Sequence, residues 1–297
     1  LYTKTSLAAP ILAAAKHEVI IMNNSTDYLE IDQFIEEKVK DFGNIEFLTI
    51  MGAPNAIPFK KKEQPYGVET YRALDPTQYA DMDNDFNPDL SVGRIQGITI
   101  SDVSSYIARD IFYHELERTD NVIFLASSFE YMLKNAENWS QDFRDAGYNA
   151  KHHTESAECY HFSSNEWINQ HLISYNDHGG YDWAGIHSTE IPWLNNSIVL
   201  ADACLTCSNY HVYSFCNNAI RRGAIAYFGA VAVAATGNEI YMNTMNGIYY
   251  QNLSIGKAFA SSYVAEYVYY MTTFIGDPTL HISPSYLLNE PLKYCYG

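Results

Sequence analysis

Short apolar runs alternate with amphipathic stretches along most of the chain. Apolar runs bounded by turn residues predict buried strands, which fall at 18–23, 46–52, 89–95, 121–128, 172–178, 197–204, 224–235 and 278–282. Between them, polar and apolar positions recur with a helical period. This periodicity predicts helices at 26–43, 101–117, 135–148, 164–173, 210–223 and 256–270. A stretch rich in Pro, Lys and Asp, residues 53–88, is expected to form a long loop.

Capping residues set several of the expected helix ends. Thr26 or Asp27 is the predicted N-cap of the first helix, and Gly43 ends it. Ser101 is expected to cap the second helix. Because the strands are apolar throughout and alternate with helices, the sequence predicts an α/β fold whose mostly parallel sheet is covered on both faces.

Two predicted strands end in polar turns with chemically active side chains. The segment YNDHGG follows one apolar run and carries His178, and ADACLTC closes the next and carries Cys204. In parallel α/β sheets, ligands bind outside the carboxyl ends of the strands. We therefore expect these two turns to lie side by side at one edge of the sheet.

A thiol and an imidazole in adjacent turns are suited to nucleophilic catalysis. The thiolate of Cys204, between a strand end and an expected helix start, would be favoured by helix N–H groups. His178 would act as general acid and base. Gly179 has no Cβ, so its N–H could approach a developing oxyanion, with the N–H of Cys204 as second donor.

Five short motifs resemble motifs of a known family and occur in the same order along the chain as in that family. YNDHGGYDW and IVLADACLTCSN resemble the His-Gly and Ala-Cys motifs of the caspase-like (clan CD) cysteine peptidases, most closely the gingipain-like branch. FLTIMGAPNAIPF resembles a further family motif, although Ala53 replaces the usual Asp. YADMDNDFNPDLSVGRI and FIGDPTLHI resemble its acidic loop and its C-terminal Gly-Asp-Pro segment.

The resemblance implies a fold and a reaction. The expected fold is a caspase-like three-layer α/β sandwich, with a smaller N-terminal α/β subdomain in residues 1–100 and a catalytic subdomain in residues 101–297. The implied reaction is hydrolysis of peptide bonds through a thioester on Cys204, with His178 as acid and base and no catalytic cofactor. Glu130 is a further candidate, because the family often places an acidic residue at that point.

The side-chain preference at the cleavage site does not transfer from the family. Gingipains carry a bulky aromatic where this chain has the small residues 234–237. Acidic candidates for contacting a basic P1 side chain are Glu130, Glu137, Asp182 and Glu239, and the predicted substrate-binding residues are Asp182, Trp183, Ala234 and Glu239.

The cysteines leave an alternative open. The chain has five of them, at positions 159, 204, 207, 216 and 295, which is not the pattern of a disulfide framework, so at least one thiol is expected. Cys207 is a rival nucleophile that is expected to serve packing. Cys204, Cys207, His211 and Cys216 also have a spacing close to that of a zinc knuckle. The alternative function is therefore an inactive peptidase-like binding or structural module with a zinc site.

A ladder of acidic residues forms a second candidate metal site. Carboxylate or amide side chains occupy alternate positions, namely Asp81, Asp83, Asp85, Asn87 and Asp89. This is the first part of an EF-hand-like calcium loop, although Phe86 replaces the usual Gly and the twelfth position is not acidic. The segment is either a structural Ca²⁺ site or a solvated acidic turn.

Charge and composition limit the classes of partner that we expect for this chain. A net charge of −17 disfavours nucleic acid as a partner, because phosphate binding requires an excess of Lys and Arg. The sequence contains no 18-residue apolar run, so no membrane span is expected. The chain begins at Leu1 rather than Met, which predicts a processed fragment with a propeptide or another part of a precursor as partner. We expect an extracellular or cell-surface location and a peptide or protein substrate.

Overall fold

The structure is a computed structural model of the whole chain. It describes residues 2–63, 72–75, 78–85, 87–116, 119–126, 129–153, 164–180, 182–183, 186–208, 213–233, 238–262, 271–282 and 287–294. Within these ranges, no helix is both long enough and apolar enough to cross a membrane.

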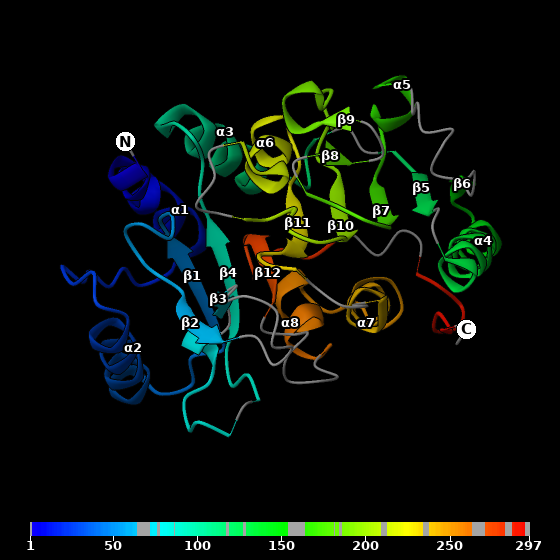
Figure 1. Cartoon of the computed structure of the whole chain (residues 1–297). Coiled ribbons are helices and arrows are strands. Elements are labelled where there is room, and N and C mark those ends of the chain that lie inside the picture. The colour runs from blue at the N-terminus through cyan, green and yellow to red at the C-terminus, as the bar shows by residue number, and fades with distance from the viewer. Residues whose placement is uncertain are drawn as a thin grey trace.

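One eight-stranded sheet forms the centre of the molecule (Figure 1). Its strands lie in the order β1 (Phe47–Met51), β4 (Ser91–Ile95), β12 (Thr272–Gly276), β11 (Ala226–Ala230), β10 (Ile198–Asp202), β7 (Leu172–Asn176), β5 (Asn121–Ala126) and β6 (Asn149–His153). Every neighbouring pair is parallel except β11 and β12. The predicted mostly parallel sheet is therefore confirmed.

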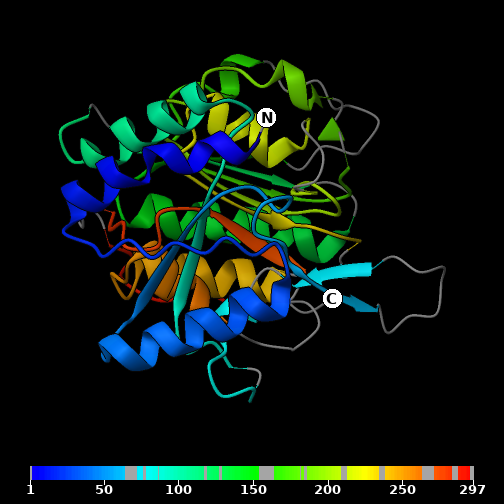
Figure 2. The ribbon, with the colours of Figure 1, turned by 90° about the vertical axis from the view of Figure 1, so that its left-hand side faces the viewer.

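Helices cover both faces of this sheet, as Figures 1 and 2 show. On one face lie α1 (Ala9–Lys16), α3 (Ile100–Ile111) and α6 (Phe215–Arg221). On the other lie α2 (Tyr28–Phe42), α4 (Glu130–Asp145), α7 (Asn238–Tyr249) and α8 (Ile255–Ala260). The central strands β7, β10 and β11 are buried at every position, which is why their sequences are apolar without alternation. The three-layer sandwich expected from the sequence is present.

Smaller elements connect these layers. A hairpin of β2 (Lys60–Glu63) and β3 (Arg72–Asp75) lies inside the segment that was expected to be a loop, followed by the short 3-10 helix η2 (Gln78–Ala80). A second short hairpin, β8 (Asp182–Trp183) with β9 (Ile186–His187), leads to the 3-10 helix η4 (Ser188–Glu190). The described part of the chain also contains the 3-10 helix η1 (Tyr2–Ala8) and the one-turn helix α5 (Ser164–Trp167).

Several sequence predictions of elements were wrong. Residues 18–23 form no strand, and Val19 and Met22 are exposed instead of packing in the sheet. Among the described residues the last strand is β12, just before the predicted 278–282, and neither β6 nor α7 was predicted. The cap of α3 is Thr99 rather than Ser101, because Thr99 Oγ1 accepts the Asp102 N–H while the Asp102 carboxylate accepts the Thr99 N–H.

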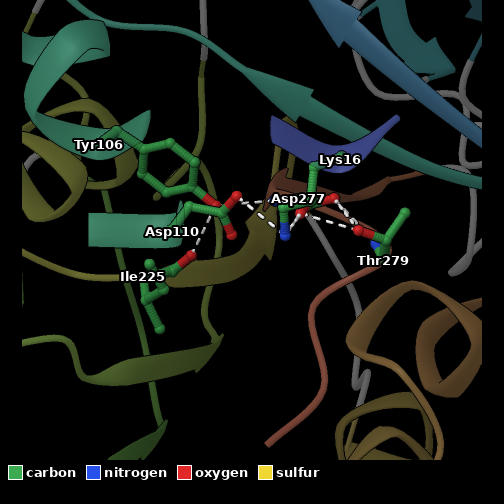
Figure 3. A network of polar contacts seen from close by, with 6 residues as sticks. All are labelled: Lys16, Tyr106, Asp110, Ile225, Asp277 and Thr279. Carbon is green, nitrogen blue, oxygen red and sulfur yellow. Dashed lines mark hydrogen bonds and ion pairs between the residues drawn. The ribbon is translucent and has the colours of Figure 1, made fainter. Parts of the chain in front are cut away.

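A buried polar network joins the N-terminal helix to the opposite end of the chain (Figure 3). Lys16 Nζ lies 2.8 Å from Asp277 Oδ2 and 3.2 Å from Asp110 Oδ2, and both carboxylates are almost fully buried. Tyr106 accepts the Asp277 N–H and donates to the Ile225 carbonyl. Burial, and then the charge of Asp277, raises the pKa of Asp110 to about 7. Asp277 belongs to the Gly-Asp-Pro motif that follows β12. Through its contacts with Lys16 of α1 and Tyr106 of α3, this motif connects both helices to the end of β12.

The first hundred residues share the sheet with the rest of the chain. β4 pairs with β12, and β1 pairs with β4, so strands from both ends of the sequence lie next to each other. The division into a subdomain of residues 1–100 and one of residues 101–297 stays a prediction.

Candidate active site

The two polar turns follow neighbouring strands of the sheet; the turn that carries His178 is called the His turn, and the turn that carries Cys204 is called the Cys turn. β7 and β10 pair in parallel, with Asn176 opposite Asp202 in the last step of the ladder. His178 and Cys204 each stand two residues beyond that step. A backbone hydrogen bond from the Asp177 N–H to the Asp202 carbonyl, 3.2 Å long, extends the pairing past the strand ends. The predicted juxtaposition of the His turn and the Cys turn is therefore a consequence of strand register.

Gly179 is the point at which the two turns touch. A Cβ built on Gly179 would lie 2.6 Å from Ala203 Cβ and 2.9 Å from both the Cys204 carbonyl oxygen and Thr206 Cγ2. These distances are well inside ordinary van der Waals contact, so only a residue without a side chain fits between the turns. This contact joins the two turns to each other; that the Gly179 N–H faces a developing oxyanion stays a prediction.

The turn that carries Cys204 is held by the neighbouring strand and by a disulfide. The Leu205 N–H donates to the Ala232 carbonyl and the Cys207 N–H donates to the Ala230 carbonyl, at 3.0 and 2.9 Å. Leu205 has φ of +58°, an uncommon backbone conformation for a non-glycine residue. A disulfide joins Cys207 to Cys216, while half-buried Cys204 retains its thiol.

The disulfide corrects two predictions about the cysteine cluster. Cys207 and Cys216 cannot ligate zinc while they are bonded to each other, so the zinc-knuckle interpretation of Cys204, Cys207, His211 and Cys216 is wrong; His211 itself lies outside the described residues. Cys207 is also excluded as a rival nucleophile. Residues 205–208 form a turn, and the next described helix is α6 from Phe215, so the expected helix N-terminus does not directly follow the thiol.

The ring of His178 is exposed, whereas its backbone is anchored. The Asp177 carboxylate accepts the His178 N–H at 2.6 Å, and the Tyr175 hydroxyl donates to the His178 carbonyl at 2.8 Å. The ring of Phe129, which precedes α4, lies 5.9 Å from the His178 ring, centroid to centroid. Sequence reasoning did not identify Phe129, Tyr175 or Asp177. Tyr175 and Asp177 could have been found from the sequence, because they stand three residues and one residue before His178.

A cluster of four aromatic rings, Tyr175, Trp183, Trp167 and Phe215, lies beneath the two turns. The Trp183 ring centroid is 4.3 Å from that of Tyr175, 4.5 Å from Phe215 and 5.0 Å from Trp167. Trp183 is 0% exposed. This burial contradicts the prediction that Trp183 contacts substrate, since its ring fills the core that supports the His turn.

Buried Asp202, the last residue of β10, lies close enough to two tyrosines for its charge to act on them. Burial, followed by the charge of Asp202, raises the pKa of Tyr241 well above its ordinary value. The same two causes raise the pKa of half-buried Tyr131. Both phenols therefore stay protonated at neutral pH.

The remaining predicted site residues occupy varied positions. Glu130 is highly exposed and forms an ion pair with Lys134 at 2.7 Å, whose hydrogen bond lowers the pKa of Glu130. Glu137 is exposed on α4, and Glu239 is half-buried in the first turn of α7. Ala234 and the Asp182 side chain lie outside the described structure.

The acidic ladder is only partly brought together. Carboxylate oxygens of Asp81, Asp83 and Asp89 lie within 4.8 Å of one another. Asp85 instead accepts hydrogen bonds from the backbone and side chain of Asn87, and these lower its pKa. A hydrogen bond from the Asp85 N–H lowers the pKa of Asp83, but desolvation and the neighbouring carboxylates outweigh it, and the net shift is upward. Three of the five predicted ligands thus share one potential cation position.

Comparison with known proteins agrees with this architecture. The model of peptidase family C25 matches residues 13–283. A solved structure described as "Structure of Protease" superposes with a TM-score of 0.74 at 14% identity, over 94% of this chain and 76% of that chain. The Saccharomyces cerevisiae separase–securin complex gives a TM-score of 0.49 at 15% identity, over 64% of this chain and 14% of that chain.

No curated protein sequence matches the chain. The family model, however, covers all eight strands of the central sheet, and it includes both the His turn and the Cys turn. The chain therefore belongs to peptidase family C25, which confirms the relationship to gingipain-like cysteine peptidases predicted from its motifs.

Proposed function

We propose that this chain is a cysteine endopeptidase whose nucleophile is Cys204 and whose general acid and base is His178. The observation that carries the proposal is the close approach of Gly179 to Ala203 and the Cys204 carbonyl. It brings a thiol and an imidazole-bearing turn together at the carboxyl ends of β7 and β10, where ligands bind in sheets of this kind.

The reaction would proceed through a thioester. His178 takes the proton of the Cys204 thiol, the thiolate adds to the scissile carbonyl, and the resulting oxyanion accepts hydrogen bonds from the backbone N–H groups of Gly179 and Cys204. His178 then protonates the leaving amine as the C–N bond breaks. In the second half, His178 removes a proton from water, which attacks the thioester and restores the thiol. Glu130 has no step in this scheme, because its carboxylate is ion-paired with Lys134.

The acidic ladder is proposed to bind one structural Ca²⁺. Asp81, Asp83 and Asp89 offer oxygen ligands, the type that Ca²⁺ prefers, and their mutual repulsion would be relieved by a cation. Asp81 is buried, whereas Asp83 and Asp89 are exposed, so an ion there would tie the loop to the body of the protein.

An extracellular or cell-surface location is supported by the disulfide between Cys207 and Cys216, because such bonds persist in oxidising compartments. The proposed substrate is a peptide or protein, and a propeptide or another part of a precursor is the proposed partner. A catalytically inactive binding module is the alternative that the following experiment distinguishes.

The test is a positional peptide library incubated with the wild-type chain and with Cys204→Ala. We expect the wild type to cleave a subset of peptides and the variant to lose activity by several orders of magnitude. A peptidyl electrophile should label Cys204, located by mass spectrometry. Cleavage by Cys204→Ala at the wild-type rate would disprove the proposed nucleophile. A wild type that neither cleaves any peptide nor reacts with the electrophile would favour the binding module.

A further inference from the structure

The backbone of His178 is held by two side chains that precede it in the sequence, one on β7 and one in its own turn. Its N–H donates to the Asp177 carboxylate at 2.6 Å, and its carbonyl accepts from the Tyr175 hydroxyl at 2.8 Å. The His178 side chain itself is exposed. The position of the imidazole in this exposed turn therefore depends on how firmly its Cα is fixed.

Both anchoring side chains are immobilised in turn. Tyr175 is 1% exposed, and its ring packs against Trp183 with a centroid distance of 4.3 Å. Asp177 is 8% exposed, and its own N–H donates to the Asp202 carbonyl at the end of β10. The hydrogen bonds to His178 thus connect it to the aromatic cluster on one side and to the strand that precedes Cys204 on the other.

This arrangement matters for proton transfer more than for binding. A general acid and base acts only when it is within hydrogen-bond reach of the atom that it protonates, and a displacement of about 1 Å costs roughly a hundredfold in rate. Ground-state binding of a peptide depends on contacts with the rest of the substrate chain. A fault in the His178 backbone should consequently lower kcat and leave KM almost unchanged.

We propose that Tyr175 and Asp177 are positioning residues for His178, fixing its backbone so that its ring addresses the Cys204 thiol and the leaving amine. This inference rests on the proposed peptidase function. Neither side chain is assigned a contact with substrate, and each acts through His178. The Asp177 carboxylate acts as a hydrogen-bond acceptor, so an amide oxygen at that position should serve almost as well.

The first test compares Tyr175→Phe with Tyr79→Phe. Tyr79 is a matched control, because it is 0% exposed and its hydroxyl donates to the Pro58 carbonyl at 2.5 Å, in the part of the chain before β4. We expect Tyr175→Phe to lower kcat about tenfold at unchanged KM, the size of one net hydrogen bond. Tyr79→Phe should lose comparable thermal stability but retain kcat. Equal kcat in both variants would overturn the role of Tyr175.

The second test compares Asp177→Ala with Asp177→Asn. Loss of the acceptor in Asp177→Ala should lower kcat by about tenfold to a hundredfold, and Asp177→Asn should restore most of that loss. Alkylation of Cys204 by iodoacetamide at neutral pH provides a readout without substrate. It should slow in Asp177→Ala and Tyr175→Phe, because a displaced imidazole supports the thiolate less well. Asn and Ala variants with the same kcat would overturn the acceptor role.

Cys204→Ala separates this inference from the proposed function. If Cys204→Ala is inactive while Tyr175→Phe and Asp177→Ala both match the wild type in kcat, the peptidase proposal stands and the positioning role is wrong. If Cys204→Ala keeps full activity, the proposed dyad itself is wrong. Circular dichroism of each variant, compared with the wild type, identifies any substitution that acts by unfolding the chain.

Discussion

Gly179 allows the contact between the two turns to be tested with a single methyl group. In Gly179→Ala the new Cβ would lie 2.6 Å from Ala203 Cβ, whereas carbon atoms in contact are normally about 3.5–4.0 Å apart. The turns must therefore separate by about 1 Å. Neither Gly179 nor Gly180 has the left-handed backbone that disfavours alanine, so the effect is steric. Overpacking of this kind costs about 1–3 kcal/mol of unfolding free energy.

The separation should be more damaging to catalysis than to folding. A shift of about 1 Å between His178 and Cys204 predicts a loss of roughly a hundredfold in kcat/KM. Gly180→Ala is the matched control, because nothing lies within 4 Å of a Cβ at that position, and it should behave as the wild type. The assay is kcat/KM on a peptide chosen from the library, with urea denaturation of all three proteins. Equal kcat/KM values for Gly179→Ala and Gly180→Ala would show that the Gly179 contact does not set the separation of His178 and Cys204.

Three further predictions concern the rest of the fold. The Cys207→Ala/Cys216→Ala double variant removes a disulfide between residues nine positions apart in the sequence. It should lower the unfolding free energy by about 2.5 kcal/mol in urea titrations, because the unfolded chain is no longer constrained. An unchanged urea midpoint would contradict this. Burial, with Asp277 nearby, raises the pKa of Asp110 from 3.8 to about 7, so protonated Asp110 stabilises the fold below about pH 4 and this contribution is lost as the pH rises to about 7. Asp110→Asn should flatten that pH dependence in thermal melts at pH 4–7, and parallel curves for the two proteins would exclude it. Ca²⁺ at about 100 times its Kd should stabilise the wild type by about 2.7 kcal/mol but should not stabilise Asp83→Asn. Thermal melts of both proteins with Ca²⁺ or with EDTA measure this. An equal shift of the melting temperature in both proteins would place the ion at another site.

The sequence predicted those features that depend on local pattern and on the geometry of parallel sheets. Apolar runs identified β7 and β10, and the rule that their carboxyl ends coincide brought His178 next to the turn of Cys204. The cap of α2 was also predictable, because Asp27 accepts the N–H groups of Leu29 and Glu30 as its position suggests.

Features that depend on tertiary packing were not predictable in this way. The helix α7 contains Gly247, which weakens its helical signal, but a Cβ there would lie 2.6 Å from Ala258 Cβ, so the glycine permits close packing against α8. Trp183 follows the His turn and resembled a substrate contact, yet only the fold shows that its ring points into the core. The spacing of Cys207 and Cys216 suited a metal as well as a disulfide, and the structure distinguishes them.

The His turn and the Cys turn share one support, and this explains why a buried aromatic cluster lies next to two polar turns. Tyr175 holds the His178 carbonyl and packs on Trp183, and Trp183 packs on Phe215. Phe215 precedes Cys216, whose disulfide holds Cys207 three residues after Cys204. A displacement of this cluster would therefore move the His178 imidazole and the Cys204 thiol together. Because both turns are fixed to the same rigid core, their separation depends on that core and on the Gly179 contact rather than on the conformation of the exposed loops.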